Sequence, residues 1–99
     1  MKRRNNYPDN VLKAVFGNAA KAAEPEKLKV FLVGFIPRRL TAEESELFFA
    51  RFGDGITLKN IAIALDVTYA EVKRLNENVM RKIRHPSSSA YLKAYLAEM

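Results

Sequence analysis

Few side chains of this 99-residue chain suit catalysis, and most of those that could do chemistry are cations. There is no cysteine, which excludes disulfides and thiolate metal sites, and a single histidine, His85, cannot by itself form a zinc site or a proton relay. The acidic cluster Glu43, Glu44 and Glu46 fits the start of a helix better than acid–base catalysis. No phosphate-binding loop and no metal-ligand spacing occur. The sequence therefore predicts a binding protein without cofactor, metal or small-molecule ligand, and not an enzyme.

Basic residues gather on one predicted helix. The segment from Thr57 to Pro86 is predicted to form two helices joined by a tight turn. The outer face of the second helix carries Lys73, Arg74, Arg81, Lys82 and Arg84. This is the pattern of a helix-turn-helix, which places its second helix in a DNA groove.

The net charge of +6 is unevenly distributed along the chain. Residues 1–40 contain nine Lys or Arg and three Asp or Glu, whereas residues 41–99 contain eight of each class. A DNA-binding helix in the second part must therefore sort opposite charges onto opposite faces, or depend on attraction by the first part. Lys2, Arg3 and Arg4 could contact phosphates, although a solvated terminus is the commoner role of such a segment. An acidic protein or a membrane surface could attract the same residues.

The predicted helix-turn-helix has recognisable boundaries. Thr57 is expected to cap its first helix. The inward stripe of that helix is Leu58, Ile61, Ala62 and Leu65. Asp66 is expected to adopt the left-handed conformation that the turn needs, and Val67 to fill the core beneath it. Thr68 and Glu71 are expected to form a capping box at the start of the second helix.

The second helix of the pair is predicted to be amphipathic. Its apolar side is Val72, Leu75, Val79 and Ile83. Its opposite side is Ala70, Lys73, Arg74, Glu77, Arg81 and Arg84. Pro86 is expected to end the helix. The helix dipole also favours cations in the last turn, so those cations do not by themselves indicate DNA binding.

Two more helices are predicted before residue 40. The first is expected to begin at a capping Asp9 and to stop at Gly17. The second is expected to start at Pro25 and to end at Pro37, with apolar residues at helical spacing. A buried strand over Val30–Ile36 is the alternative, but that strand would have no partner. Apolar residues occur all round this helix, so we expect it to be buried or to dock a partner.

Two further helices complete an all-α prediction. Residues 41–53 should open with a capping box of Thr41 and Glu44. Residues 87–89 should cap a C-terminal helix, whose apolar stripe either folds back on the core or is exposed for another protein. The longest apolar run, Val30–Ile36, is far shorter than the ~20 residues that span a bilayer, and no secretory signal precedes it. We therefore expect no membrane contact and a cytoplasmic protein.

Residues 40–96 resemble region four of bacterial RNA polymerase sigma factors of the primary type. The matching pieces are LTAEE, RFG, TLKNIA, LDVT and RKIRHPSSS. In the family the last piece is typically Arg-Lys-Leu-Arg-His-Pro-Ser followed by a short helix, and its distance after a helix-turn-helix makes the resemblance specific. We therefore expect two parts: a basic helical extension over residues 1–39, which resembles no family, and a region-four-like domain over residues 40–99.

The resemblance implies how this domain would act. In the family, the recognition helix binds a promoter element and another surface docks on the flap of the polymerase β subunit. Double-stranded promoter DNA and RNA polymerase are therefore the expected partners, and the nucleoid the expected location. The expected DNA-binding residues are Thr57, Leu58, Lys59, Thr68, Tyr69, Ala70, Lys73, Arg74, Glu77 and Arg81.

Some of these positions depart from the family. Primary-type members usually have Arg-Glu in place of Tyr69-Ala70, and Arg-Gln in place of Lys73-Arg74. Tyr69 and Ala70 suggest stacking or contact with a thymine methyl group rather than paired hydrogen bonds to base edges. We therefore expect a different or weaker sequence preference. Lys73 and Arg74 would contact base edges or nearby phosphates, and the expected phosphate contacts are Arg51, Lys59 and Arg81.

Nothing in the chain resembles the sigma region that binds the polymerase clamp and melts promoter DNA. A free-standing region-four protein, one part of a split sigma factor and an accessory regulator are all consistent with that. Two alternatives to DNA reading stay open. The chain could be an interaction module that docks on polymerase or a sigma-related partner, or a small homodimeric repressor whose residues 1–36 form the dimer interface.

Overall fold

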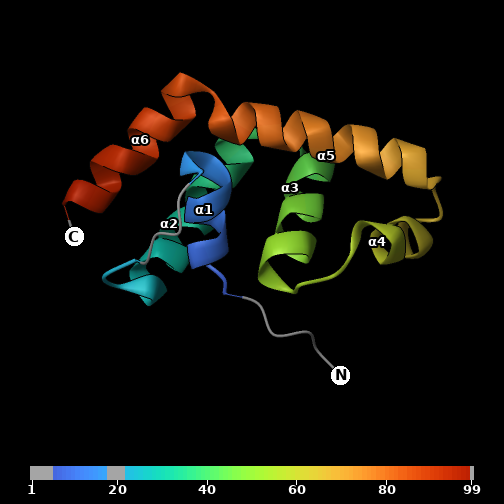
Figure 1. Cartoon of the computed structure of the whole chain (residues 1–99), viewed down its shortest axis with the longest axis horizontal. Helices are drawn as coiled ribbons and strands as arrows, with labels where there is room; N and C mark the ends of the chain where they lie inside the picture. The colour runs from blue at the N-terminus through green and yellow to red at the C-terminus, as the bar shows by residue number, and fades with distance from the viewer. Residues whose placement is uncertain (1–5, 18–21, 99) are drawn as a thin grey trace.

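A computed structural model describes residues 6–17 and 22–98, and they form an all-α fold built around one long helix. Their elements in chain order are α1 (Asp9–Phe16), α2 (Pro25–Arg39), α3 (Ala42–Phe48), the π-helical segment η1 (Phe49–Gly53), α4 (Leu58–Leu65), α5 (Tyr69–Arg84) and α6 (Pro86–Ala97). Helix α5 runs along one edge of the molecule, where α1, α3, α4 and α6 all contact it (Figure 1). The predicted all-α fold class is confirmed, and α1 and α2 are the two helices predicted before residue 40.

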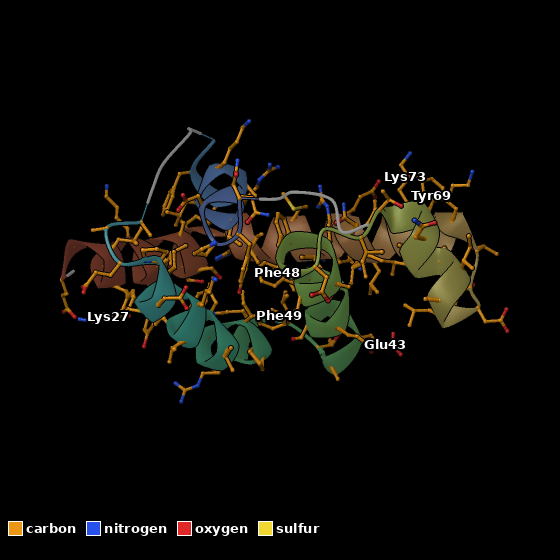
Figure 2. The ribbon with its side chains drawn as sticks, turned by 90° about the horizontal axis from the view of Figure 1, so that it is seen from below. Lys27, Glu43, Phe48, Phe49, Tyr69 and Lys73 are labelled. Atoms are coloured by element: carbon orange, nitrogen blue, oxygen red, sulfur yellow. The ribbon has the colours of Figure 1, made fainter. Side chains whose placement is uncertain are left out.

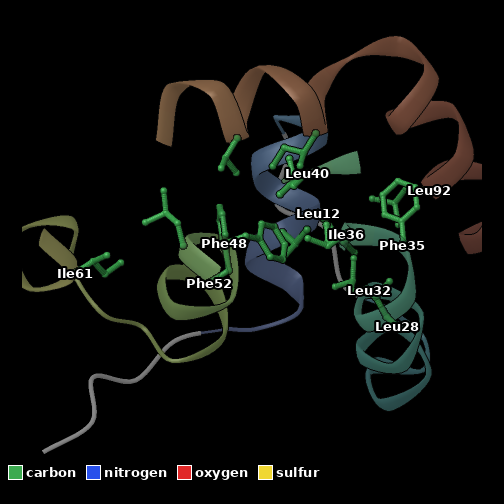
Figure 3. Close-up of a cluster of buried hydrophobic side chains, with 14 of the residues drawn as sticks. Leu12, Leu28, Leu32, Phe35, Ile36, Leu40, Phe48, Phe52, Ile61 and Leu92 are labelled. Carbon is green, nitrogen blue, oxygen red and sulfur yellow. The ribbon is translucent and has the colours of Figure 1, made fainter. Parts of the chain in front are cut away.

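Buried apolar side chains from every one of these helices meet in a single cluster (Figure 3). Phe48 is fully buried within it, edge-on to Phe49 and 4.9 Å from the ring of Phe52. Val11 and Leu12 of α1 belong to the same cluster. The two N-terminal helices therefore share a core with the helix-turn-helix. The division of the chain at residue 40 into two domains stays a prediction.

Helix α1 has the predicted extent but not the predicted cap. It begins at Asp9 and ends at Gly17, whose φ of 78° is the left-handed conformation that glycine adopts most easily. The prediction that Asp9 caps the helix was wrong, because its Oδ1 accepts a hydrogen bond from the backbone N–H of Ala22 instead, at 2.9 Å. That carboxylate thus ties α1 to the segment before α2. The basic residues 2–4 lie outside the described residues.

Helix α2 begins at Pro25, as predicted, and is a helix rather than a strand. The prediction that Pro37 ends it was wrong, because α2 continues to Arg39. Proline has no N–H, so only the bond to the carbonyl of Val33 is lost, and Val33 lies on the exposed side of the helix. The backbone N–H of Leu40 still donates to the carbonyl of Ile36 at 2.9 Å. One missing bond on the solvent side does not stop the last turn.

The predicted helix over residues 41–53 is divided into two kinds of helix. Its start has both bonds of the capping box: the Glu44 N–H donates to Thr41 Oγ1 at 3.2 Å, and the Thr41 N–H donates to Glu44 Oε1 at 2.8 Å. Its end is the wider π-helical turn η1, closed by a bond from the Asp54 N–H to the carbonyl of Phe49. The wide turn brings Phe52 into the core next to Phe48.

Glu44 is a buried carboxylate with a specific cation beside it. Lys82 of α5 donates from Nζ to Glu44 Oε1 at 2.7 Å, which ties α5 to the start of α3. Burial alone would raise the pKa of Glu44, but the hydrogen bonds from Lys82 and Thr41 outweigh it, so this pKa lies below its usual value of 4.5. The charged form of Glu44 therefore stabilises the fold.

Replacing Glu44 by glutamine is expected to lower the free energy of unfolding at neutral pH by about 1–3 kcal/mol, because the charge-assisted bond from Lys82 is lost. The folded-state pKa is the lower one, so the contribution of Glu44 is present above about pH 4.5 and is lost as the pH falls through the folded-state pKa. As the pH falls, the free energy of unfolding should therefore decline less for the variant than for the wild type. Urea unfolding at a series of pH values measures this, and identical pH profiles for the two proteins would contradict it.

The C-terminal helix α6 folds back on α2. Its predicted cap by residues 87–89 was wrong: His85 is the N-cap, and its Nδ1 accepts from the backbone N–H of Ser87 at 3.2 Å. Pro86 starts α6 because its fixed φ suits a first helical residue, and the three serines fall inside the helix. The ring of Tyr95 stacks on that of Phe31 at 4.0 Å, so α6 packs on α2. None of the described helices is long and apolar enough to cross a membrane.

Candidate nucleic-acid interface

Helices α4 and α5 meet in a tight turn whose caps are the predicted ones. Thr57 Oγ1 accepts from the Asn60 N–H at 3.2 Å and starts α4. Asp66 has φ 55° and ψ 46°, the left-handed conformation, and ends it. Thr68 Oγ1 accepts from the Glu71 N–H at 3.1 Å, and the Glu71 carboxylate accepts from the Thr68 N–H at 3.2 Å. These predictions are confirmed, and the three caps fix where α5 begins.

Two residues of this turn do not point inward as predicted. Ile61 and Ala62 are buried between α4 and its neighbours, but Leu65 is 40% exposed and Val67 is 41% exposed. The predictions that Leu65 joins the inward stripe and that Val67 fills the core were wrong. Ile61 and Ala62 already occupy the space beneath α4, so Leu65 and Val67 line a groove beside α5 instead.

One face of α5 is free of core contacts and carries the predicted recognition residues. At about 100° per residue, they fall within an arc of roughly 140°. Figure 2 shows two of them, Tyr69 and Lys73, close together on one side of the molecule. The buried residues Val72, Val79 and Ile83 lie on the other side of α5. The exposed residues of the arc are Tyr69, Ala70, Lys73, Arg74, Glu77 and Arg81.

The start of α4 contributes the remaining predicted contacts. Thr57 and Lys59 are exposed, whereas Leu58 is half-buried against the core. The first N–H groups of a helix attract anions such as phosphate. A threonine hydroxyl that accepts a capping bond can still donate its own hydrogen. Thr57 and Thr68 can therefore each cap a helix and bind a phosphate.

Three cations that seemed available are held within the fold. Lys82 pairs with Glu44, and Arg84 Nε donates to the carbonyl of Ala14 in α1 at 2.7 Å. Arg51 NH1 donates to Asn76 Oδ1 at 2.7 Å. Burial lowers the pKa of Arg51, and the nearby charge of Arg84 lowers it further.

The placement of Lys82 on the outer face of α5 was wrong. Its position seven residues after the inward Leu75 is a sequence signal that could have shown this.

Opposite charges are sorted between two sides of the helix-turn-helix. The exposed arc of α5 carries Lys73, Arg74 and Arg81 against one carboxylate, Glu77. Glu43, at the start of α3, lies on the opposite side of the molecule from Tyr69 and Lys73 (Figure 2). Residues 41–99, which contain equal numbers of acidic and basic residues, thus have a cationic face on the side that a groove would meet.

This arrangement is a helix-turn-helix whose second helix has an exposed, cationic N-terminal half. Residues 38–85 match the family model described as sigma-70, region 4. Residues 38–85 are a sigma-70 region 4 domain. No solved structure matches the chain. The region 4 match runs from the end of α2 through α3, α4 and α5 to the cap of α6.

Sigma-70 region 4 is a DNA-binding helix-turn-helix family linked to sigma factors and transcription regulation, and it is not an enzyme family. The chain therefore carries a DNA-binding regulatory domain. Within the part of the chain that the structure describes, no three His, Asp or Glu side chains come together to hold a metal ion. The region 4 match leaves out α1 and most of α2.

Proposed function

We propose that this protein regulates transcription by binding promoter DNA through α5, with the N-terminal half of that helix in the major groove. The observation that carries the proposal is the exposed arc of α5 beside a capped α4 N-terminus, in a region 4 domain. Among the described residues, neither Lys73 nor Arg74 makes a hydrogen bond or an ion pair within the protein. Both side chains are therefore available to a ligand.

Each residue of this face has a proposed role. Lys73 and Arg74 contact base edges or the phosphates next to them, and Lys59 and Arg81 contact phosphates. Tyr69, half-exposed at the start of α5, stacks or packs with Ala70 against thymine methyl groups. Phosphate contacts set the position of the helix, while Tyr69 and Ala70 set a preference for sequence that differs from that of primary sigma factors.

The proposal predicts a defined salt dependence of duplex binding. Each cation that contacts a phosphate contributes about 0.9 to the slope of log affinity against log salt concentration, so Lys59, Lys73, Arg74 and Arg81 predict a slope between about −3 and −4. Fluorescence anisotropy of a labelled duplex, titrated at several salt concentrations, measures this slope. Absence of salt-dependent binding to every duplex tested would rule out the proposal. Selection from a random DNA pool, with and without RNA polymerase, would identify the target.

Docking on the flap of the RNA polymerase β subunit is the second part of the proposal, and the region 4 match supports it. The alternative function is an interaction module that binds polymerase or a sigma-related protein without reading DNA. The exposed apolar residues of α2 favour that alternative. Polymerase capture by a variant that has lost Lys73 and Arg74 distinguishes the two contacts, because docking should survive the loss of DNA binding.

A further inference from the structure

Helix α2 exposes an apolar surface although its other side is part of the core. Val30 is 74% exposed and Val33 is 65% exposed, while Leu28, Leu32 and Ile36 are buried. Next to the two valines is Gly34, where an added Cβ would meet open space. Side chains this apolar and this exposed, side by side on one helix, are typical of a surface that another molecule covers.

This surface borders a groove between α2 and α6 that we call the basic groove. Its volume is about 340 Å³. Its floor is a series of stacked rings: Phe31 and Phe35 are 5.2 Å apart, and Phe35 and Tyr91 are 5.4 Å apart. The charged residues that line it are Arg38 and Arg39. The groove therefore combines an apolar floor with a positive rim.

A second groove, which we call the acidic groove, lies beside the turn between α4 and α5. Its volume is about 410 Å³, and Leu65 and Val67, the two residues that failed to turn inward, help to line it. The charged residues that line it are all carboxylates: Glu43, Glu46 and Glu71. This groove also combines an apolar floor with a charged rim, but its sign is opposite to that of the basic groove.

The two grooves cannot meet within one molecule. Helix α6 lies at one end of the molecule and α4 at the other (Figure 1), and the longest extent is 41 Å. Both helices are held by the same buried cluster, so neither can move to the other without loss of the core. A second copy, however, presents the missing complement to each groove.

We propose that two copies of this chain associate head to tail, with the α2 ridge and basic groove of one against the acidic groove of the next. Val30 and Val33 would cover Leu65 and Val67, and Arg38 and Arg39 would face Glu43 and Glu46. The two surfaces differ, so the contact is heterologous and can be repeated by further copies. The exposed arc of α5 stays free, which would let neighbouring copies bind DNA together. The association itself does not depend on the proposed DNA binding.

Sedimentation velocity across the micromolar range is the test, with charge-reversal variants of each groove. The wild-type chain should gain mass with concentration, and less so at high salt because the rims are screened. The double variant Arg38→Glu, Arg39→Glu and the double variant Glu43→Lys, Glu46→Lys should each associate at least about tenfold more weakly, since like charges then face each other. An equimolar mixture of the two variants should associate again, because their grooves are complementary.

Three controls separate this proposal from simpler effects. Circular dichroism should show each variant folded, and each should bind a short duplex as the wild type does, because all four substitutions lie off the exposed arc of α5. Reversing an exposed charge outside both grooves, Lys93→Glu, should leave association unchanged. A wild-type monomer at every concentration would overturn the proposal, as would association that neither reversal weakens or a mixture that fails to recover it. A wild-type chain that associates but binds no duplex would overturn only the proposed function.

Discussion

Replacing Phe48 by alanine is expected to lower the free energy of unfolding by about 3–5 kcal/mol, the largest effect of any single substitution that we predict. Phe48 is fully buried, and its ring contacts Phe49 edge-on and Phe52 at 4.9 Å. Alanine would remove the ring and leave a cavity that helices held by separate contacts cannot collapse to fill. A domain of this size has a total stability of only about 5–15 kcal/mol, so the variant should be close to unfolding.

Urea denaturation followed by circular dichroism measures this loss directly. A matched control is Ile63→Ala in α4, which also removes a large apolar side chain but one that is 71% exposed. We expect that control to change stability by no more than about 0.5 kcal/mol. Equal effects of the two substitutions would mean that Phe48 is not at the centre of the core.

Replacing Lys73 and Arg74 together by alanine is expected to weaken duplex binding by about 2–4 kcal/mol, or roughly thirty- to a thousandfold. Both side chains are exposed on the N-terminal half of α5. Their loss should leave stability nearly unchanged, since neither packs in the core. The slope of log affinity against log salt should fall by about one for each side chain that had contacted a phosphate.

Anisotropy titrations of the double variant and the wild type on the same duplex test this expectation. The matched control is the double variant Lys13→Ala, Lys93→Ala, which removes the same number of positive charges from exposed positions on α1 and α6. If DNA is drawn only by the net charge of the protein, the two double variants will lose affinity equally. If α5 enters the groove, the Lys73 and Arg74 variant alone will lose most of it.

The helix-turn-helix could be predicted because its signals are local. A threonine with a glutamate three residues later closes a capping box within a single turn, as Thr68 and Glu71 do. The left-handed conformation of Asp66 could be predicted because the turn between the two helices needs a residue that tolerates positive φ. The exposed arc of α5 follows from helical periodicity alone. The roles of its residues in DNA binding stay predictions.

Several of the errors occur where a residue's environment is made by a distant part of the chain. Asp9 was expected to cap its own helix but bonds to Ala22, and Lys82 was expected to face solvent but pairs with Glu44, 38 residues away. Leu65 and Val67 are apolar and were expected to be buried, yet Ile61 and Ala62 fill the available space. No local pattern reports which of several apolar residues the core has room for.

The sequence alone therefore determined the all-α class, the caps at Thr41, Thr57 and Thr68, the left-handed turn at Asp66 and the exposed arc of α5, because hydrogen bonds and periodicity within a few residues fix each of them. Only the tertiary structure decided which cations remain available to a ligand, since Lys82, Arg84 and Arg51 are held by partners far away in sequence. It also decided that two grooves of opposite charge lie toward opposite ends of the molecule, because the packing of the described helices on one core sets which apolar residues stay exposed.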